Sequence, residues 1–264
     1  MTMNGIAARL PMTPGRRLWL AIGLPVGLVL IGWIGFNLVA LIGQAQYPVS
    51  QAIPASAHRV TVNVGQGNVH MQGTTGEQAR LTGTAHYTLV RPRLITRVTT
   101  AGTDFGYDCT FPVGNCGLDA TVSVPRAMPA SVRTGGGDAT VSDTADAVAL
   151  TTDGGNVLAQ RVSGNLTLTT DGGDITASAI TAPRVTAHTS GGNVTVVFAR
   201  VPANVTVSTD GGDITIVVPP GPTHYRLTEH TTGGTAHGLI PTDSSSPNVI
   251  TATTSGGNIT IRKS

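Results

Sequence analysis

The second half of the chain repeats one short motif seven times, and this repeat limits the possible folds more than any other feature. Each copy has a threonine, a small or acidic residue, two glycines and then Asp, Asn or Thr. Successive copies lie 18, 18, 19, 20, 22 and 23 residues apart. Such a period is too long for a heptad and too short for a domain, and it is typical of stacked repeats. The second glycine of each copy is Gly137, Gly155, Gly173, Gly192, Gly212, Gly234 and Gly257.

Each repeat is expected to hold two short strands, one turn of fixed length and one turn that tolerates insertions. Runs such as Leu166-Thr-Leu168-Thr alternate with period two, which indicates half-buried strands with threonine ladders outside. One unit cannot stand alone, because ordering about 20 residues costs about 1–2 kcal/mol each, whereas two to four buried aliphatics return about 1.5–3 kcal/mol each. We therefore predict an all-β fold, a β-solenoid of two-strand coils of about 18–23 residues. A β-sandwich is the alternative, since turns every 8–12 residues also suit it.

The turn residues have two interpretations, conformational and metal-binding. Glycine suits a tight turn because it adopts positive φ without strain, and a flanking Asp or Asn can accept hydrogen bonds from nearby backbone N–H groups. Carboxylates stacked about 4.8 Å apart could instead bind Ca²⁺. Serine interrupts the first row of carboxylates and asparagine interrupts the second, so we favour turn capping and predict no metal site. The first row holds Asp153, Asp171 and Asp210, interrupted by Ser190 and Ser255, and the second holds Asp138, Asp174 and Asp213, interrupted by Asn156 and Asn193.

The N-terminal part predicts a membrane anchor. Residues 18–42 contain no charged side chain, and as a helix they would span about 37 Å, enough to cross a hydrocarbon core of about 30 Å. Arg9, Arg16 and Arg17 precede this stretch, so the positive-inside rule keeps residues 1–17 in the cytoplasm as a short tail. A cleaved signal peptide ending near Ala45 is the competing interpretation. Residues 43–57 are expected to form a linker or a first edge strand, and residues 58–264 an extracytoplasmic β domain.

The two cysteines, Cys109 and Cys116, lie in one short loop. Zinc would need further ligands, so outside the cytoplasm we predict a disulfide between them. The formal net charge is only +2 and no basic stripe or RNA-type motif appears, which argues against nucleic acid as a partner. The last strand is expected to end at Arg262-Lys263-Ser264, where charge would discourage end-to-end stacking of open edges.

The sequence offers little for catalysis or cofactor binding. The seven histidines are scattered and show no metal-ligand spacing, and no P-loop, dinucleotide fingerprint or nucleophile elbow is present. His224, His230 and His237 lie with Glu229 in the insertion-prone region, and these three histidines are expected to be solvated loop residues rather than a site. We therefore predict no catalytic residue, no cofactor and no enzymatic activity.

The Thr-Asp-Gly-Gly-Asp/Asn-Ile/Val repeats, the Val122-Ser-Val124-Pro125 strand end before them and the short N-terminal anchor resemble the bacterial DUF4097 family of adhesin-like proteins. The resemblance covers roughly residues 58–262. It implies an exported β-solenoid domain without catalytic residues, with links to cell-envelope stress systems in some members.

Together these features predict a single-pass membrane protein that presents a β-solenoid outside the cytoplasm. Its expected function is adhesion to a wall polymer or to an envelope protein through the exposed faces of the stack. A regulatory component of an envelope stress response, docking on another membrane protein, is the alternative. A polysaccharide-acting enzyme ranks third, because no cluster of acids or bases repeats on one face.

Overall fold

The computed structural model describes residues 22–42, 44–54, 57–88, 91–100, 102–108 and 116–264. The chain divides into two compact units, Met1–Gln44 and Ala45–Ser264. The described part of the first unit is a helix, α2 (Leu24–Ile42), which carries no charged side chain. Within the described residues, no helix combines the length and the apolar character needed to cross a membrane.

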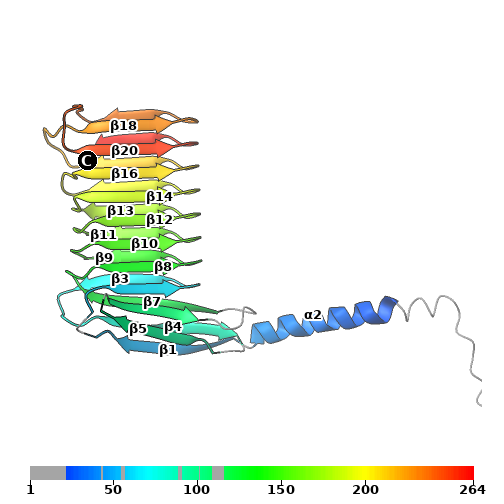
Figure 1. The fold of residues 1–264 in the computed structure, drawn as a ribbon. Coiled ribbons are helices and arrows are strands. Elements are labelled where there is room, and N and C mark those ends of the chain that lie inside the picture. The colour runs from blue at the N-terminus through cyan, green and yellow to red at the C-terminus, as the bar shows by residue number, and fades with distance from the viewer. Residues whose placement is uncertain (1–21, 43, 55–56, 89–90, 101, 109–115) are drawn as a thin grey trace, which may run out of the picture. The chain divides into compact units, whose positions relative to one another are not determined.

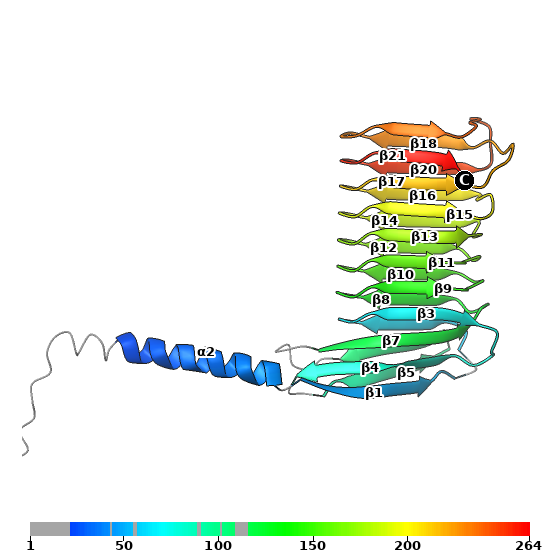
Figure 2. The same ribbon diagram turned by 180° about the vertical axis from the view of Figure 1, so that it is seen from behind.

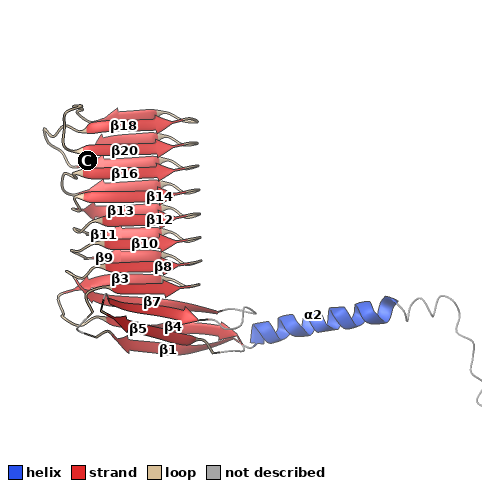
Figure 3. Ribbon diagram, in the orientation of Figure 1, coloured by secondary structure: helices blue, strands red, loops and turns tan. Residues whose placement is uncertain are grey.

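The second unit consists of two large sheets that run along a stack of coils, and in the described residues it contains only strands and turns (Figures 1 and 3). Sheet A has 11 strands in the order β1 (Gln44–Ala52), β4 (Arg80–Thr88), β7 (Cys116–Pro125), β3 (Val69–Thr74), β9 (Ala139–Ser142), β11 (Val157–Gln160), β13 (Ile175–Ile180), β15 (Val194–Phe198), β17 (Ile214–Val218), β21 (Ile259–Lys263) and β19 (Ala236–Leu239). Sheet B has 10 strands in the order β18 (Arg226–Thr231), β20 (Val249–Thr254), β16 (Asn204–Thr209), β14 (Arg184–Thr189), β12 (Leu166–Thr170), β10 (Val148–Thr152), β8 (Ala130–Thr134), β2 (Val60–Val64), β6 (Gly102–Asp108) and β5 (Arg93–Thr99).

The predicted solenoid is confirmed by the strand register. Neighbouring coils pair in parallel with equivalent residues side by side, for example Leu150 with Leu168 and Thr151 with Thr169. The aliphatic member of each alternating pair points inward, and Leu150 and Leu168 are completely buried. Because every coil presents the same inner face, the aliphatics form continuous columns, which is how a repeat too small to fold alone acquires a core.

The coils do not stack in the order in which they occur along the chain. The C-terminal coil, β20 and β21, lies between the coil of β16 and β17 and the coil of β18 and β19 (Figure 2). At the other end, β2 and β3 lie between β6–β7 and β8–β9. The expectation that Arg262-Lys263-Ser264 guards an open edge is therefore wrong, because β21 is an interior strand that pairs with both β17 and β19.

The glycine corners stack directly on one another, as the repeat predicts. A Cβ atom placed on Gly155 would lie 2.1 Å from the carbonyl oxygen of Gly137, and one on Gly173 would lie 2.0 Å from that of Gly155. The same contact recurs at Gly192, Gly212 and Gly257. The column ends at Gly234, which lies against the carbonyl oxygen of Gly257. Any side chain at these positions would push two coils apart.

The expected conformational reason for these glycines is wrong. None of the seven has φ in the left-handed region, so they are required by close backbone approach and not by positive φ. The left-handed residues of three successive coils lie at the other corner and are not glycines: Asp143 at 60°, Arg161 at 51° and Ala179 at 53°. There Asp143 accepts two hydrogen bonds from the Arg161 guanidinium, at 2.7 and 2.8 Å.

A column of threonines, buried in every coil except the outermost, connects the glycine corners by hydrogen bonds. Thr170 Oγ1 donates to the carbonyl oxygen of Gly155 in the next coil at 2.8 Å and accepts from the N–H of Gly173 in its own turn at 3.2 Å. Threonine at the equivalent position does the same in five further coils, so these threonines lie inside the corner and not in an outer ladder. The other members are Thr152, Thr189, Thr209, Thr231 and Thr254.

The N-terminal end of the stack is less regular. Here β4 pairs with β7, and β5 with β6, in the antiparallel sense. Residues 44–52, expected as linker or first edge, form the edge strand β1 of sheet A. Cys116 begins β7, whereas Cys109 lies outside the described residues, so the Cys109–Cys116 disulfide stays a prediction.

Candidate functional site

A ladder of Asp and Asn side chains runs along the outside of the stack, one from each coil, directly before a sheet A strand except for Asp119, which lies within β7. Each side-chain Oδ1 accepts a hydrogen bond from the backbone N–H of the ladder residue in the next coil, as when Asn156 N donates to Asp138 at 2.7 Å. The predicted capping role is therefore correct, but the bonds join different coils and not residues of one turn. In spatial order the ladder is Asp119, Asn68, Asp138, Asn156, Asp174, Asn193, Asp213, Asn258 and Thr235.

Acid and amide alternate strictly along this ladder from Asp119 to Asn258, although they do not alternate along the sequence. The rearranged order of the terminal coils produces the alternation, because it seats Asn258 beside Asp213 and Asn68 between Asp119 and Asp138. Neighbouring coils lie about 4.8 Å apart, so carboxylates are separated by about 10 Å, where salt screens their repulsion. The amide groups also donate to the acids, as Asn68 Nδ2 does to Asp119 at 3.1 Å.

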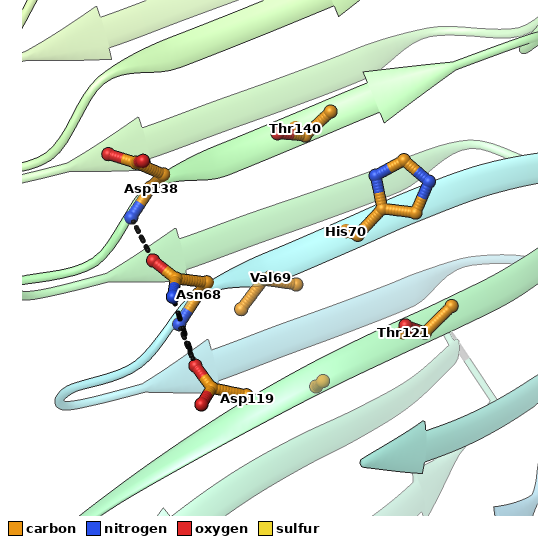
Figure 4. Close-up of a pocket in the computed structure, with 8 residues that line it drawn as sticks. Asn68, Val69, His70, Asp119, Thr121, Asp138 and Thr140 are labelled. Atoms are coloured by element: carbon orange, nitrogen blue, oxygen red, sulfur yellow. Dashed lines mark hydrogen bonds between the residues drawn. The ribbon is translucent and has the colours of Figure 1, made fainter. Parts of the chain in front are cut away.

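The ladder ends in a polar surface on sheet A, where β3, β7 and β9 meet (Figure 4). Asp119 Oδ1 accepts from the backbone N–H of Asn68 at 2.8 Å, while Asp119 Oδ2 lies 3.0 Å from His86 Nε2 on the antiparallel strand β4. His70 lies on β3, the neighbour of β7, and is in register with Thr121 on β7 and Thr140 on β9. The side chains of His86 and Asp119 are 32% and 48% exposed, so this pair is accessible to a ligand.

An open depression of about 320 Å³ lies beside the His86–Asp119 pair and is lined by Asp119 and His70 but not by His86. Its lining combines acceptors, donors and an imidazole on rigid strands, which suits hydrogen bonding to a polar ligand. The lining residues are Asn68, Val69, His70, Asp119, Ala120, Thr121, Asp138 and Thr140.

Sequence reasoning missed this site, although one signal was available. Residues 119–123 and 138–142 are the same pentapeptide, Asp-Ala-Thr-Val-Ser. The second copy follows a glycine turn and is part of the recognised repeat, so the first copy marks Asp119 as a ladder residue. The pairing of His86 with Asp119 has no such signal, because it depends on the antiparallel return of β4 along β7.

The residues singled out from the sequence are distributed as follows. The seven glycines gather in one column with Gly67, which makes them structural. Asp153 lies 3.8 Å from Arg133, an exposed ion pair of adjacent coils. Across the described residues, no group of three or more His, Cys, Asp or Glu side chains is placed to hold a metal ion.

Two sheets of in-register parallel coils, closed at one end by antiparallel strands, define the class of this protein as a β-solenoid with a non-repetitive base. The chain belongs to the DUF4097 family, described as Toastrack DUF4097, whose profile matches residues 49–262. A search among curated proteins finds no significant match.

Solved structures share this fold at low sequence identity. A "putative adhesin" from Bacteroides fragilis aligns with a TM-score of 0.56 and 18% identity, covering 83% of this chain and 97% of that one. A "putative adhesin" from Parabacteroides merdae gives a TM-score of 0.46 and 11% identity, covering 84% and 96%. At 18% identity, the Bacteroides fragilis structure supports only the fold. The TM-score of the Parabacteroides merdae structure is too low for a conclusion about this chain.

Proposed function

We propose that this protein is a non-enzymatic binding protein of the cell envelope that adheres to a wall polymer through the outer face of sheet A. The observation that carries this proposal is the depression beside the His86–Asp119 pair, where side chains of three strands converge. A polysaccharide presents rows of hydroxyl groups, which match the alternating donors and acceptors of such a surface. The description of the Bacteroides fragilis neighbour as an adhesin agrees with this role.

The binding site is rigid, which favours a repetitive ligand. Asp119 is held on both oxygens, by Asn68 on one side and by His86 on the other, so little conformational freedom is lost when a ligand binds. The surface also continues along the stack, because Thr121 and Thr140 on either side of His70 start a row of outward residues that runs on through Leu158, Thr176 and Thr195. A long polymer could therefore contact several coils at once, which raises its overall affinity.

Sedimentation with purified cell wall tests this proposal. The full chain is expected to sediment with the wall, and His70→Ala and His86→Ala are expected to weaken binding several-fold. Thr167→Ala is the matched control, because Thr167 is an exposed outward residue of sheet B. Equal binding by all four proteins would contradict the assignment of the site, and no sedimentation of the unmodified chain would contradict adhesion itself.

A membrane location for this binding protein is supported by the sequence. Residues 18–42 are uncharged, and arginines at positions 9, 16 and 17 precede them. Such a chain would remain in the membrane pellet after alkaline carbonate extraction, with the β unit cleaved by protease added outside intact cells. Release into the supernatant as a shortened chain would instead support a cleaved signal peptide.

A second candidate function is docking on a neighbouring membrane protein as part of an envelope stress response. The observation that favours it is the edge strand β5, whose Ile95 and Val98 are 37% and 56% exposed. Beside it lies a second open depression, of about 370 Å³, lined in part by Asn63, Arg97 and Asp104. A photocrosslinker at Val98 that captures one membrane protein would support docking, and capture by the wall polymer alone would exclude it.

A further inference from the structure

The C-terminal end of the stack leaves two strand edges without a neighbour. There β18 and β19 are the last strands of sheets B and A, and no further described strand pairs with them. Every residue of β19 is exposed, and Leu239 is 69% exposed. Inside the stack, edges of the same kind pair with the next coil, so this end is a template for another copy of the chain unless something blocks it.

One residue of this last coil departs from the pattern of the interior. Register pairs run from Glu229 to Ala252, from Ala252 to Val207 and from Val207 to Ala187. The three aliphatic members of this column are at most 1% exposed. Glu229 therefore occupies a core position. At this position the outermost coil has a carboxyl group, whereas the three coils beneath it have Ala or Val.

The neighbours of Glu229 allow its side chain to close the end of the interior. Opposite it, Gly238 takes the place that Ile261 has in the coil beneath. A Cβ atom on Gly238 would lie 2.8 Å from Glu229 Oε2 and 2.6 Å from Leu227 Cδ2, so both side chains lean across this glycine. Among the described residues, Glu229 Oε1 is buried without a hydrogen-bond partner.

We propose that Glu229, placed over Gly238, terminates the solenoid by preventing a second copy of the chain from stacking on its open end. A docked coil would cover the carboxylate completely, and an ionised group buried without a partner is strongly unfavourable. The same end would accept a copy if this position were apolar, because the half-buried Leu227 and the unpaired edges of β18 and β19 already supply a matching surface.

Burial raises the pKa of Glu229 above its ordinary value of 4.5, and the charge of His237 on β19 opposes this rise. The strand beneath, β20, has no ionisable side chain. On β21, Arg262 is exposed and the Lys263 ammonium donates to the Gly221 carbonyl oxygen. As the pH falls toward the raised pKa, Glu229 becomes neutral and its block weakens, so association should increase as the solution is acidified.

Light scattering coupled to size-exclusion chromatography tests this proposal on the full chain in nonionic detergent. At pH 7.5 the unmodified protein is expected to be monomeric, whereas Glu229→Leu should associate at least tenfold more tightly. Thr228→Leu is the matched control, since it adds the same side chain to the same strand but on the exposed outer face. Glu229→Ala, which copies Ala252 of the coil beneath, repeats the test with a residue that this register already accommodates.

The pH arm separates a charge block from a steric one. As the pH is lowered from 7.5 toward the raised pKa of Glu229, the unmodified protein should begin to associate, while Glu229→Leu should respond little. The proposal is overturned if both Glu229 variants stay monomeric with unchanged circular dichroism, if Thr228→Leu associates as strongly, or if the unmodified protein is already associated at pH 7.5.

Discussion

Replacing one glycine of the stacked column should destabilise the solenoid, whereas replacing its neighbour in the same turn should not. In Gly173→Ala the new Cβ atom would lie 2.0 Å from the Gly155 carbonyl oxygen, at least 1 Å closer than side chains tolerate. The nearest atom to a Cβ atom on Gly172 is 3.7 Å away, an ordinary contact. Gly172→Ala is thus a control with identical chemistry in the same corner.

The expected loss follows from what the clash disrupts. Forcing two coils apart by about 1 Å resembles overpacking a core, which costs about 1–3 kcal/mol. The same movement weakens the bond from Thr170 Oγ1 to the Gly155 carbonyl oxygen and the bond from Gly173 N to Thr170 Oγ1, each worth about 0.5–1.5 kcal/mol. Gly173→Ala should therefore lose about 2–5 kcal/mol, and Gly172→Ala should change stability by less than about 1 kcal/mol, because its φ is compatible with alanine.

Urea titration followed by circular dichroism measures this difference. Because repeat proteins can open locally, hydrogen exchange at the Gly155 and Gly192 corners checks whether the loss is confined to adjacent coils. A loss of the same size in both alanine variants would refute close backbone approach as the reason for the second glycine.

Three further perturbations test the corner columns. Thr170→Val should cost about 1–3 kcal/mol in urea titration because it leaves a buried carbonyl and an N–H unpaired, whereas Thr169→Val on the outer face should change stability by less than about 0.5 kcal/mol. Asn156→Asp should lower the melting temperature at low ionic strength by an amount equivalent to about 1 kcal/mol, because it places three carboxylates in adjacent coils, and added salt should reverse most of the loss. Arg161 lowers the pKa of Asp143 below its ordinary 3.8, so this pair stabilises the fold above that pH and its contribution disappears as the pH falls through the lowered pKa. Thermal melts from pH 7 to pH 2 should accordingly show a gap between the unmodified chain and Asp143→Asn that closes in acid; a constant gap would argue against this linkage.

The sequence predicts the coil because its cause is local and repeated. Each glycine pair follows a run of alternating aliphatics at constant spacing, so the two-strand unit, its inward face and the stacking of Gly155 on Gly137 can all be inferred from period and burial. The reason for the glycines could not be inferred, because positive φ and close backbone approach select the same residue. The two explanations are distinguished by the position of the carbonyl oxygen in the adjacent coil, which lies too close for a Cβ atom.

The candidate site and the order of the terminal coils depend on contacts that are distant in sequence. His86 contacts Asp119 because β4 pairs with β7 in the antiparallel sense, and no spacing in the sequence predicts this contact. The C-terminal coil carries the same motif as the others, so its motif suits any position in the stack. Within the ladder, insertion beside Asp213 gives Asn258 an acidic neighbour, whereas stacking in sequence order would place Asn258 beside Thr235 alone.

Cysteine cross-linking tests the stacking order most directly. Thr206 on β16 is the register partner of Thr251 on β20, and Thr251 is in turn the partner of Thr228 on β18. Disulfides need Cα atoms about 4.4–6.8 Å apart, a range that adjacent coils meet and coils two steps apart exceed. Under mild oxidation, Thr206→Cys with Thr251→Cys should form a disulfide detectable by peptide mapping, and Thr206→Cys with Thr228→Cys should not. The opposite result would place the coils in sequence order and contradict the interleaved stack.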